Sequence, residues 1–274
     1  MSSKEIRCNL CCSIEFKIIY KEGIFKLCKC KKCGLVYVNP IPPKKELFKY
    51  YNEKYYTPWQ ETQGRLRYKI WQRRMDRIER FKKKGRLLDV GCGLGMFLGE
   101  AKKRGWHVFG TEVSEYARDY IKKSYGIEIF YGEFKESSFR DNFFDVVTFW
   151  HVLEHMPDPL GNLVRAWQVL KPQGLIVIAV PNINNYIFRI AYLCTKFRRF
   201  KIFSLQKREI HLYHFSPYTL RKIIEKAGFR PLRFDVDKEK IGVAHHVLNT
   251  VASFLYKVSR INIGMAIEAF ASKE

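Results

Sequence analysis

The stretch RLLDVGCGLG, residues 86–95, decides the fold. Its first five residues form a short apolar run that predicts a buried β-strand, and three glycines alternate through the turn that follows. From Met96 to Lys103, apolar side chains recur at helical spacing. Glycines let the backbone approach a ligand and leave the N–H groups at the start of the helix open. The stretch therefore predicts a strand, a ligand-binding loop and a helix of an α/β fold.

A second apolar run, from Trp106 to Gly110, predicts the neighbouring strand, and Glu112 follows it. Nucleotide-binding α/β folds place a carboxylate at this position, where it accepts hydrogen bonds from the ribose hydroxyls. The glycine pattern is D-x-G-x-G-x-G, and Met96 stands where a dinucleotide fingerprint would have its last glycine. These residues predict a nucleoside-bearing ligand.

At these residues the chain resembles the class I S-adenosylmethionine (SAM)-dependent methyltransferases. Further segments follow in the order of that family: a fourth strand at 143–149, a fifth at 175–180, a helix from Ser216-Pro217 to Lys226, a sixth strand after Phe229 and an antiparallel seventh at 264–273. The resemblance covers residues 86–274. It implies an α/β fold with a seven-stranded Rossmann-like methyltransferase sheet, and SAM as the cofactor.

Six of the eight cysteines lie within the first 33 residues. Cys8 and Cys11 form one C-x2-C pair, and Cys30 and Cys33 form another, a spacing that presents four thiolates to one tetrahedral Zn²⁺. Three short strands are expected around them, at 14–20, 24–27 and 35–38. Residues 1–43 are therefore predicted to be a zinc ribbon with a structural ion, although the neighbouring Cys12 and Cys28 could substitute as ligands.

Residues 44–85 are predicted to form a helical cap or linker, because apolar residues recur at near-helical spacing from Leu66 to Phe81. A further segment, at about 183–212, is expected to be a lid inserted into the methyltransferase domain at 86–274. Its residues 188–208 interleave basic and aromatic side chains. Such a mixture suits phosphate-bearing glycans, lipid-linked molecules at a membrane face or stacked RNA bases.

The formal net charge of +23 is concentrated in residues 1–85 and 186–233. An excess of this kind attracts anions, so RNA, an anionic membrane surface and an anionic small molecule are candidate partners, with a merely solvated surface as the alternative. The sequence has no apolar run of about 18 residues and no apolar signal segment at its start. We therefore expect a cytoplasmic protein, with peripheral contact at the inner membrane face as an option.

The resemblance implies which residues hold the cofactor. Asp89 and the glycine loop would hold the methionine end, Glu112 the ribose and the turn at Glu133 the adenine, while residues 150 and 151 would border the methyl group. The expected cofactor-binding residues are Asp89, Gly91, Cys92, Gly93, Gly95, Glu112, Glu133, Trp150 and His151.

An oxygen acceptor needs its proton removed, and a neutral imidazole suits that task. His211 is the first candidate for this catalytic base and His151 the second, followed by His155. The chain is also similar to the quinone-biosynthesis O-methyltransferases, and this resemblance implies a divalent-metal site at His151, Glu154 and His155. A histidine at the first of these positions disfavours Mg²⁺, which prefers oxygen ligands.

The predicted function is SAM-dependent methyl transfer to a small-molecule, saccharide-linked or lipid-linked acceptor, with oxygen as the expected acceptor atom. One alternative is an RNA methyltransferase that grips its substrate with the basic blocks. Another is a non-catalytic SAM-binding scaffold that carries a zinc ribbon, because a fold alone does not determine activity.

Overall fold

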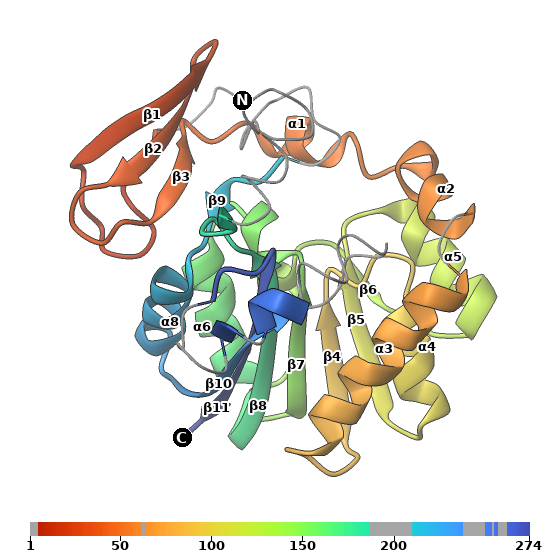
Figure 1. Ribbon diagram of the computed structural model, residues 1–274. Helices are drawn as coiled ribbons and strands as arrows, with labels where there is room; N and C mark the ends of the chain where they lie inside the picture. Colours follow the sequence, from red (N-terminus) through yellow and green to blue (C-terminus); the bar gives the residue numbers. More distant parts are fainter. Residues whose placement is uncertain (1–4, 62–63, 187–209, 238–249, 254, 257–261) are drawn as a thin grey trace.

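The computed structural model describes residues 5–61, 64–186, 210–237, 250–253, 255–256 and 262–274. Two β-sheets organise the chain, a small one near the N-terminus and a large central one (Figure 1). The basic and aromatic stretch 188–208, and with it most of the expected lid, lies outside the described residues. In the described part of the chain, every helix is too short or too polar to cross a bilayer.

The central sheet has seven strands in the order β10-β11-β8-β7-β4-β5-β6. The central strand is β7 (Phe144–Trp150). On one side of it lie β4 (Arg86–Val90), β5 (His107–Glu112) and β6 (Phe130–Tyr131), and on the other side lie β8 (Leu170–Pro181), β11 (Ala266–Lys273) and β10 (Phe229–Asp237). Neighbours from β6 to β8 are parallel, whereas β11 is antiparallel to both β8 and β10. The predicted seven-stranded sheet with an antiparallel last strand is confirmed.

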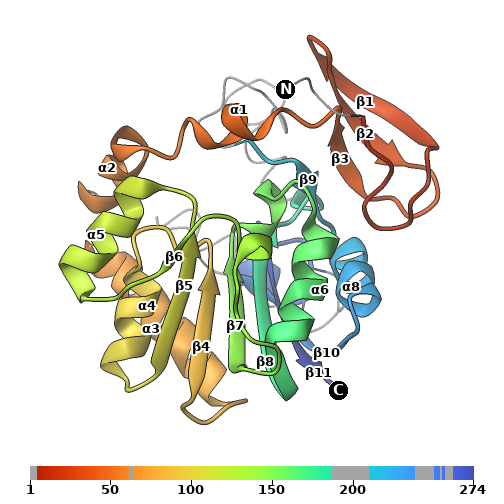
Figure 2. The same ribbon diagram turned by 180° about the vertical axis from the view of Figure 1, so that it is seen from behind.

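Helices cover both faces of this sheet because successive residues of each buried strand point to opposite faces. In β4, Leu87 packs with the core that α3 (Gly64–Glu79) and α4 (Met96–Lys103) cover, and Leu88 packs with the core on the side of α6 (Pro159–Val169) and α8 (Pro217–Lys226). Figures 1 and 2 show these two layers from opposite sides. The described part of the chain also contains α1 (Lys44–Phe48), α2 (Glu53–Glu61) and α5 (Glu115–Tyr125), short 3₁₀ turns at Phe134–Glu136 and Leu153–His155, and helical residues at 250–253 and 255–256.

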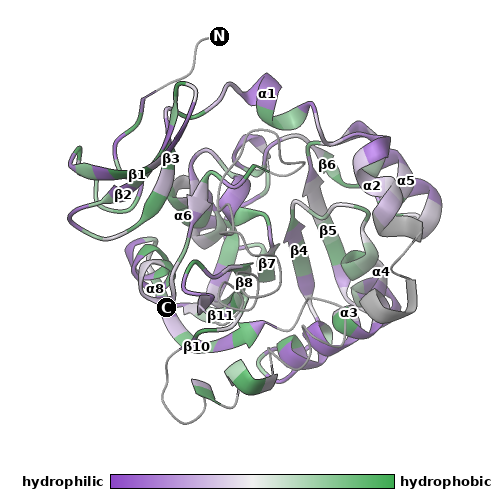
Figure 3. Cartoon of the chain, turned by 45° about the horizontal axis from the view of Figure 1, so that its top comes forward, coloured by the Kyte–Doolittle hydropathy of each residue, from purple (hydrophilic) through white to green (hydrophobic). Residues whose placement is uncertain are grey.

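Local sequence signals set the helix starts. Ser216 and Thr219 form a capping box at α8, and the Asp158 side chain accepts the Gly161 backbone N–H at the start of α6. The hydrophobic residues follow the central strands, while the outward side of α3 is hydrophilic (Figure 3). Two arginines of α3 point inward instead, where Arg74 pairs with Asp237 of β10 and Arg77 pairs with Asp235 and with Glu268 of β11.

The N-terminal sheet contains β1 (Phe16–Glu22), β2 (Phe25–Cys30) and β3 (Val36–Asn39), close to the three expected strands. A fourth strand completes it from the distant part of the chain: β9 (Tyr213–His214) pairs with β3, with Val36 opposite His214. The short range of β9 gave no periodicity from which it could be predicted. The N-terminal sheet, which corresponds to the expected ribbon, is therefore linked to the large domain by the backbone hydrogen bonds between β3 and β9 as well as by the covalent connection through residues 40–85.

Candidate active site

A pocket lies where the parallel strands β4, β5 and β7 end, the edge at which open α/β sheets bind ligands. Its floor comes from residues at or after these strand ends, and its upper wall comes from residues 47–56 of the N-terminal segment. The lining includes Asp89, Gly91, Cys92, Gly93, Glu112, Glu133, Trp150 and His151, which are eight of the nine residues expected to hold the cofactor. The ninth, Gly95, is the N-cap of α4.

The glycine loop after β4 leaves no room for side chains at two positions. Gly91 has a φ of +66°, and a Cβ atom there would lie 2.4 Å from Cγ2 of Val152. Gly95 has a φ of +72°, and its Cβ would lie 2.7 Å from Cγ1 of Ile121. Both the left-handed backbone and the close neighbours therefore require glycine, which keeps the loop against the pocket and opens the N-terminus of α4 toward it.

Asp89 ends β4 as a buried carboxyl group, only 2% exposed. Its Oδ1 accepts a hydrogen bond of 2.7 Å from the Thr148 hydroxyl on the adjacent strand β7. Burial raises the pKa of Asp89 to about 7, although the Thr148 hydrogen bond and the charge of Arg74 oppose this rise. A ligand with positive charge near Asp89 would favour the ionised carboxylate.

Glu112 ends β5 and is held by the backbone. Its two oxygens accept N–H groups from Gly93 at 2.8 Å, Val113 at 2.8 Å and Ser114 at 3.0 Å, and Tyr56 adds a side-chain hydrogen bond. Burial raises the pKa of Glu112 against these hydrogen bonds. The carboxyl group is thus fixed at the pocket wall, where a ligand hydroxyl could replace the Tyr56 side chain as one of its donors.

The N-terminal segment covers the pocket from above, with α1 and α2 at the top of the molecule (Figure 1). Lys44 of α1 forms an ion pair of 2.5 Å with Glu133, the residue expected at the adenine, and a longer one of 3.3 Å with Glu136. Tyr51, Tyr55 and Tyr56 stack edge to face in the same wall. The ion pair between Lys44 and Glu133 therefore holds the N-terminal cap against the edge of the pocket.

His151 follows β7 in a left-handed conformation, with a φ of +54°, and lies in the pocket wall. Its Nε2 is 2.9 Å from Oδ2 of Asp237, and its Nδ1 is 3.8 Å from Oε1 of Glu154. An ionised carboxylate can only accept, so Nε2 carries the proton in the contact with Asp237. This fixes the imidazole orientation and its tautomer.

Arg74 completes this network from α3. Its guanidinium is buried, lies 2.8 Å from Oδ2 of Asp237 and stacks over the rings of Trp150 and Trp71 at 4.1 and 4.8 Å. Burial by itself would raise the pKa of Asp237, but Arg74 and His151 hold it well below its usual range. Asp237 is therefore a charged partner for His151.

The other two candidate histidines lie side by side next to the pocket. His155 lines it, and its Nδ1 is 2.9 Å from the Ile210 carbonyl oxygen, which leaves Nε2 as the unprotonated nitrogen of a neutral ring. His211 packs against His155 with the ring centroids 4.7 Å apart. Among the described residues that line the pocket, His211 does not occur.

The structure brings together a different trio from the one that the quinone-enzyme resemblance implies as a metal site. Ligand atoms of Glu154, His155 and His211 all lie within 4.8 Å of one another, whereas the Nε2 of His151 is held by Asp237. One carboxylate and two imidazoles suit Mn²⁺, Fe²⁺, Co²⁺ or Zn²⁺ better than Mg²⁺. These residues could hold such an ion at the pocket rim.

A family model described as a methyltransferase domain matches residues 62–233, more than half of the chain. The chain is a SAM-dependent methyltransferase. It is 28% identical over 177 residues to a ubiquinone biosynthesis O-methyltransferase of Aromatoleum aromaticum, covering 61% of this chain and 71% of the relative. It is 29% identical over 180 residues to a demethylmenaquinone methyltransferase of Staphylococcus saprophyticus, covering 59% and 77%.

Solved structures share the fold of this methyltransferase. A SAM-dependent methyltransferase from Archaeoglobus fulgidus superposes with a TM-score of 0.56 at 24% identity, over 80% of this chain and 100% of that one. A possible histamine N-methyltransferase from Thermotoga maritima gives a TM-score of 0.55 at 18% identity, over 84% and 98%. At these identities the likeness establishes the sheet architecture and no acceptor.

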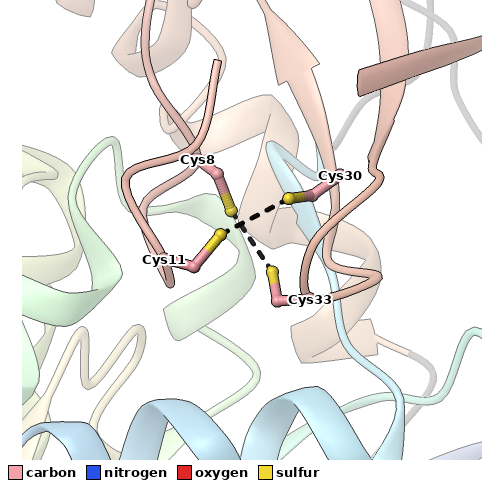
Figure 4. Close-up of side chains that lie close together, drawn as sticks. All are labelled: Cys8, Cys11, Cys30 and Cys33. Atoms are coloured by element: carbon pink, nitrogen blue, oxygen red, sulfur yellow. Dashed lines mark hydrogen bonds between the residues drawn. The ribbon is translucent and has the colours of Figure 1, made fainter. Parts of the chain in front are cut away.

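The four cysteines of the methyltransferase's N-terminal segment point toward one another (Figure 4). The Sγ atoms of Cys8 and Cys33 are 3.5 Å apart, those of Cys11 and Cys30 are 3.4 Å apart, and all four lie within 4.8 Å of one another. Cys12 is exposed, and the buried Cys28 thiol contacts the Lys26 carbonyl oxygen. The geometry is compatible with one tetrahedral zinc ion on the two C-x2-C pairs.

The N-terminal cysteine module also contacts the loop that connects the 3₁₀ turn Leu153–His155 to α6, and the start of α6 itself. The Asn9 amide nitrogen donates to Oδ1 of Asp158 at 2.9 Å, and its oxygen accepts the Leu160 backbone N–H at 2.8 Å. The Tyr213 hydroxyl of β9 donates to the carbonyl of Pro157, a residue that lines the pocket. The cysteine module therefore braces one wall of the methyltransferase site.

Several site residues were missed from the sequence: Tyr56, Arg74, Thr148 and Asp237. A carboxylate at the end of a strand, as Asp237 is at the end of β10, or an arginine within a basic helix has the local signature of an exposed residue. Only the positions of strand ends β7 and β10 on the same edge of the sheet could have suggested that Asp237 meets His151.

Proposed function

We propose that this methyltransferase transfers the methyl group to a hydroxyl of a small aromatic, quinone-type acceptor. One observation carries the proposal: the pocket beside the glycine loop has a wall of aromatic and apolar side chains. His151 and His155 line the same pocket. That wall is formed by Leu47, Phe48, Tyr50, Tyr51, Tyr55, Trp71, Trp150, Met156 and Ile210. The similarity to a ubiquinone biosynthesis O-methyltransferase and to a demethylmenaquinone methyltransferase supports the same acceptor class.

SAM, when bound, supplies a methyl group on a sulfonium that keeps the bonding electron pair as the methyl moves to the acceptor oxygen. In the proposed arrangement Asp89 and the glycine loop hold the methionine end, Glu112 accepts the ribose hydroxyls and Glu133 borders the adenine. Holding donor and acceptor in line provides most of the rate acceleration. Trp150 and the tyrosines of the cap keep water out of the pocket.

His151 is our proposed acceptor of the hydroxyl proton, which it would take on Nδ1. Two observations favour it over His211: it lies in the pocket wall, and Asp237 fixes its other nitrogen. His211 remains the second candidate, acting beside His155 at the pocket rim. Zn²⁺ on Cys8, Cys11, Cys30 and Cys33 is proposed to be structural, since four thiolates leave no open position for chemistry.

Methyl-labelled SAM tests the proposal. The purified protein is incubated separately with catechol-type phenols, with total RNA, and with saccharide-linked and lipid-linked host fractions. We expect label in the phenols, and a loss of about 100-fold or more in kcat for His151→Ala with thermal stabilisation by S-adenosylhomocysteine retained. Label found only in RNA would support the nucleic-acid alternative, and cofactor binding without transfer to any fraction would support the scaffold.

A further inference from the structure

The hairpin of β1 and β2 exposes an unusual number of apolar side chains. Among the described residues, fourteen large hydrophobic side chains are exposed, and five of them lie within residues 14–24. Ile14 and Ile24 are the most exposed of all, at 68% and 64%. We call the set Ile14, Ile18, Ile19, Tyr20 and Ile24 the hairpin surface. A concentration of this kind marks an interaction site more often than single exposed residues do.

Exposed lysines alternate with the hairpin surface along β1 and follow it along and after β2. The stretch from Ile14 to Cys33 contains six lysines and two glutamates, and Lys17, Lys21, Lys29, Lys31 and Lys32 are exposed. Hydrophilic and hydrophobic residues are interspersed along β1 and β2 (Figure 3). Lysine ammonium groups at the rim of an apolar patch can reach a negatively charged layer while their aliphatic stems lie along the apolar surface.

The form of β1 disfavours pairing with a strand of another protein. β1 is the edge strand of its sheet, but its register shifts between Ile18 and Tyr20, and Lys17 and Lys21 flank that irregularity. Bulges and edge lysines are the features by which proteins block strand addition. The hairpin surface is therefore better suited to a partner that needs no hydrogen-bonding register.

The side chains also distinguish a bilayer from RNA. Single-stranded RNA binds by stacking bases on aromatic rings, whereas four of the five residues in the hairpin surface are isoleucines. Isoleucine has no ring to stack but partitions readily into the boundary between headgroups and acyl chains. Apolar insertion together with a lysine rim is the combination that binds anionic lipid.

The hairpin lies on the pocket side of the molecule. In Figures 1 and 2, which share the vertical axis, β1 and β2 stand at the top, the side at which the parallel strands β4, β5 and β7 end. The pocket opens at those strand ends. Contact of the hairpin with a surface would turn that side of the molecule toward the surface.

We propose that the hairpin surface docks the protein on an anionic lipid bilayer, with the isoleucines inserted at the headgroup boundary and the neighbouring lysines contacting lipid phosphates. The proposal concerns the ribbon and does not depend on the identity of the methyl acceptor. It explains why a module with no place in the chemistry carries exposed isoleucines and an excess of lysine.

Vesicle flotation with the full-length, zinc-loaded protein tests the proposal. The protein is mixed with vesicles of phosphatidylcholine alone and with vesicles containing about 30% phosphatidylglycerol. We expect binding to the anionic vesicles only, weakened about fivefold for each lysine neutralised in Lys17→Gln and Lys21→Gln. Ile18→Ser with Ile24→Ser is expected to weaken binding about tenfold.

Matched controls keep the result interpretable. Val164→Ser with Leu232→Ser removes two exposed aliphatic side chains elsewhere, at 39% and 41% exposure, and should bind vesicles as the parent does. The zinc content and melting temperature of each variant verify folding, and stabilisation by S-adenosylhomocysteine verifies the cofactor site independently.

Three kinds of result would overturn the proposal. The first is vesicle binding that is equal for neutral and anionic vesicles, or that the hairpin substitutions leave unchanged. The second is loss of affinity for a uridine homopolymer in the hairpin variants while vesicle binding persists, which would assign the surface to RNA. The third is dissociation of a dimer in the hairpin variants by sedimentation velocity with vesicle binding intact, which would assign it to a second copy of the chain.

Discussion

The Nε2 atom of His151 lies 2.9 Å from Oδ2 of Asp237, although the two residues are 86 positions apart. Asp237 in turn receives the buried guanidinium of Arg74, so the imidazole faces a carboxylate that stays charged. A base oriented in this way is held in one tautomer, with Nδ1 as its unprotonated nitrogen. The contact makes Asp237 a positioning residue for the proposed methyl transfer.

Substitution of Asp237 by Asn tests this role. The amide nitrogen of Asn can donate to Nε2 and so stabilise the wrong tautomer of His151. We expect kcat to fall about 100-fold with KM changed little, and the pH–rate midpoint to move to lower pH because a neighbouring negative charge is lost. An unchanged pH profile, with activity reduced only in proportion to a lower melting temperature, would reduce Asp237 to a structural partner of Arg74.

The buried carboxyl group of Asp89 predicts a pH dependence of stability. Its pKa is about 7 in the folded protein and 3.8 in the unfolded chain. Between pH 3.8 and about pH 7, the folded state therefore binds a proton that the unfolded state has lost. The resulting stabilisation is complete below pH 3.8 and is lost as the pH rises through about 7. Asp89→Asn keeps an acceptor for the Thr148 hydroxyl but does not titrate.

Chemical denaturation of the ligand-free protein at several pH values measures the effect. Between about pH 5 and pH 7.5 the unfolding free energy of the parent should fall by ~2 kcal/mol more than that of Asp89→Asn. The comparison between variants cancels the other titrating groups. Parallel stability curves for the two proteins would show that Asp89 is not protonated in the folded state.

Loss of a zinc thiolate should destabilise the whole protein. Cys33→Ser is expected to reduce the metal content from one zinc per chain to half or less, and to lower the melting temperature by about 5 °C or more, because metal affinity contributes to folding. Cys12→Ser is the matched control, since this exposed cysteine lies outside the cluster. Equal zinc content in both variants, by elemental analysis, would contradict the ligand assignment.

The contact between ribbon and pocket wall depends on Asn9. Asn9→Ala removes the hydrogen bonds to Asp158 and to the Leu160 backbone, and leaves a helix N-terminal N–H without its partner. We expect a cost of ~1–2 kcal/mol in unfolding free energy. Ser13→Ala, which removes a hydrogen bond within the exposed ribbon, should cost less than ~0.5 kcal/mol. Similar costs for the two changes would show that the ribbon is not braced at this point.

The trio of Glu154, His155 and His211 predicts selectivity among divalent ions. We expect Mn²⁺ to raise the melting temperature by about 2 °C or more and Mg²⁺ to have no effect, because two imidazoles suit the softer ion. His211→Ala should abolish the Mn²⁺ effect, whereas His107→Ala, at an exposed position on β5, should not. A larger shift with Mg²⁺ would indicate a site built from oxygen ligands instead.

Local sequence predicted the elements whose signal lies within a few residues. The apolar run before the glycine loop, the helix from Met96 to Lys103 and the Ser216 cap all match the structure. The pairs of cysteines were predicted for the same reason, since C-x2-C is a local motif that forms one turn. The ends of strands β1 to β3 shifted by one to three residues, because edge positions carry little burial signal.

The sequence by itself determined the strand and helix on either side of the glycine loop, the loop itself, and the pairing of two thiolate turns, because each depends on the periodicity or conformational limits of neighbouring residues. Only the tertiary structure decided that Asp237 meets His151, that Arg74 lies buried between two tryptophans, and that β9 joins the ribbon. His151 and Asp237 are 86 positions apart in the sequence, and Arg74 and Asp237 are 163 positions apart. Their formation depends on sheet order and packing, which no local pattern encodes.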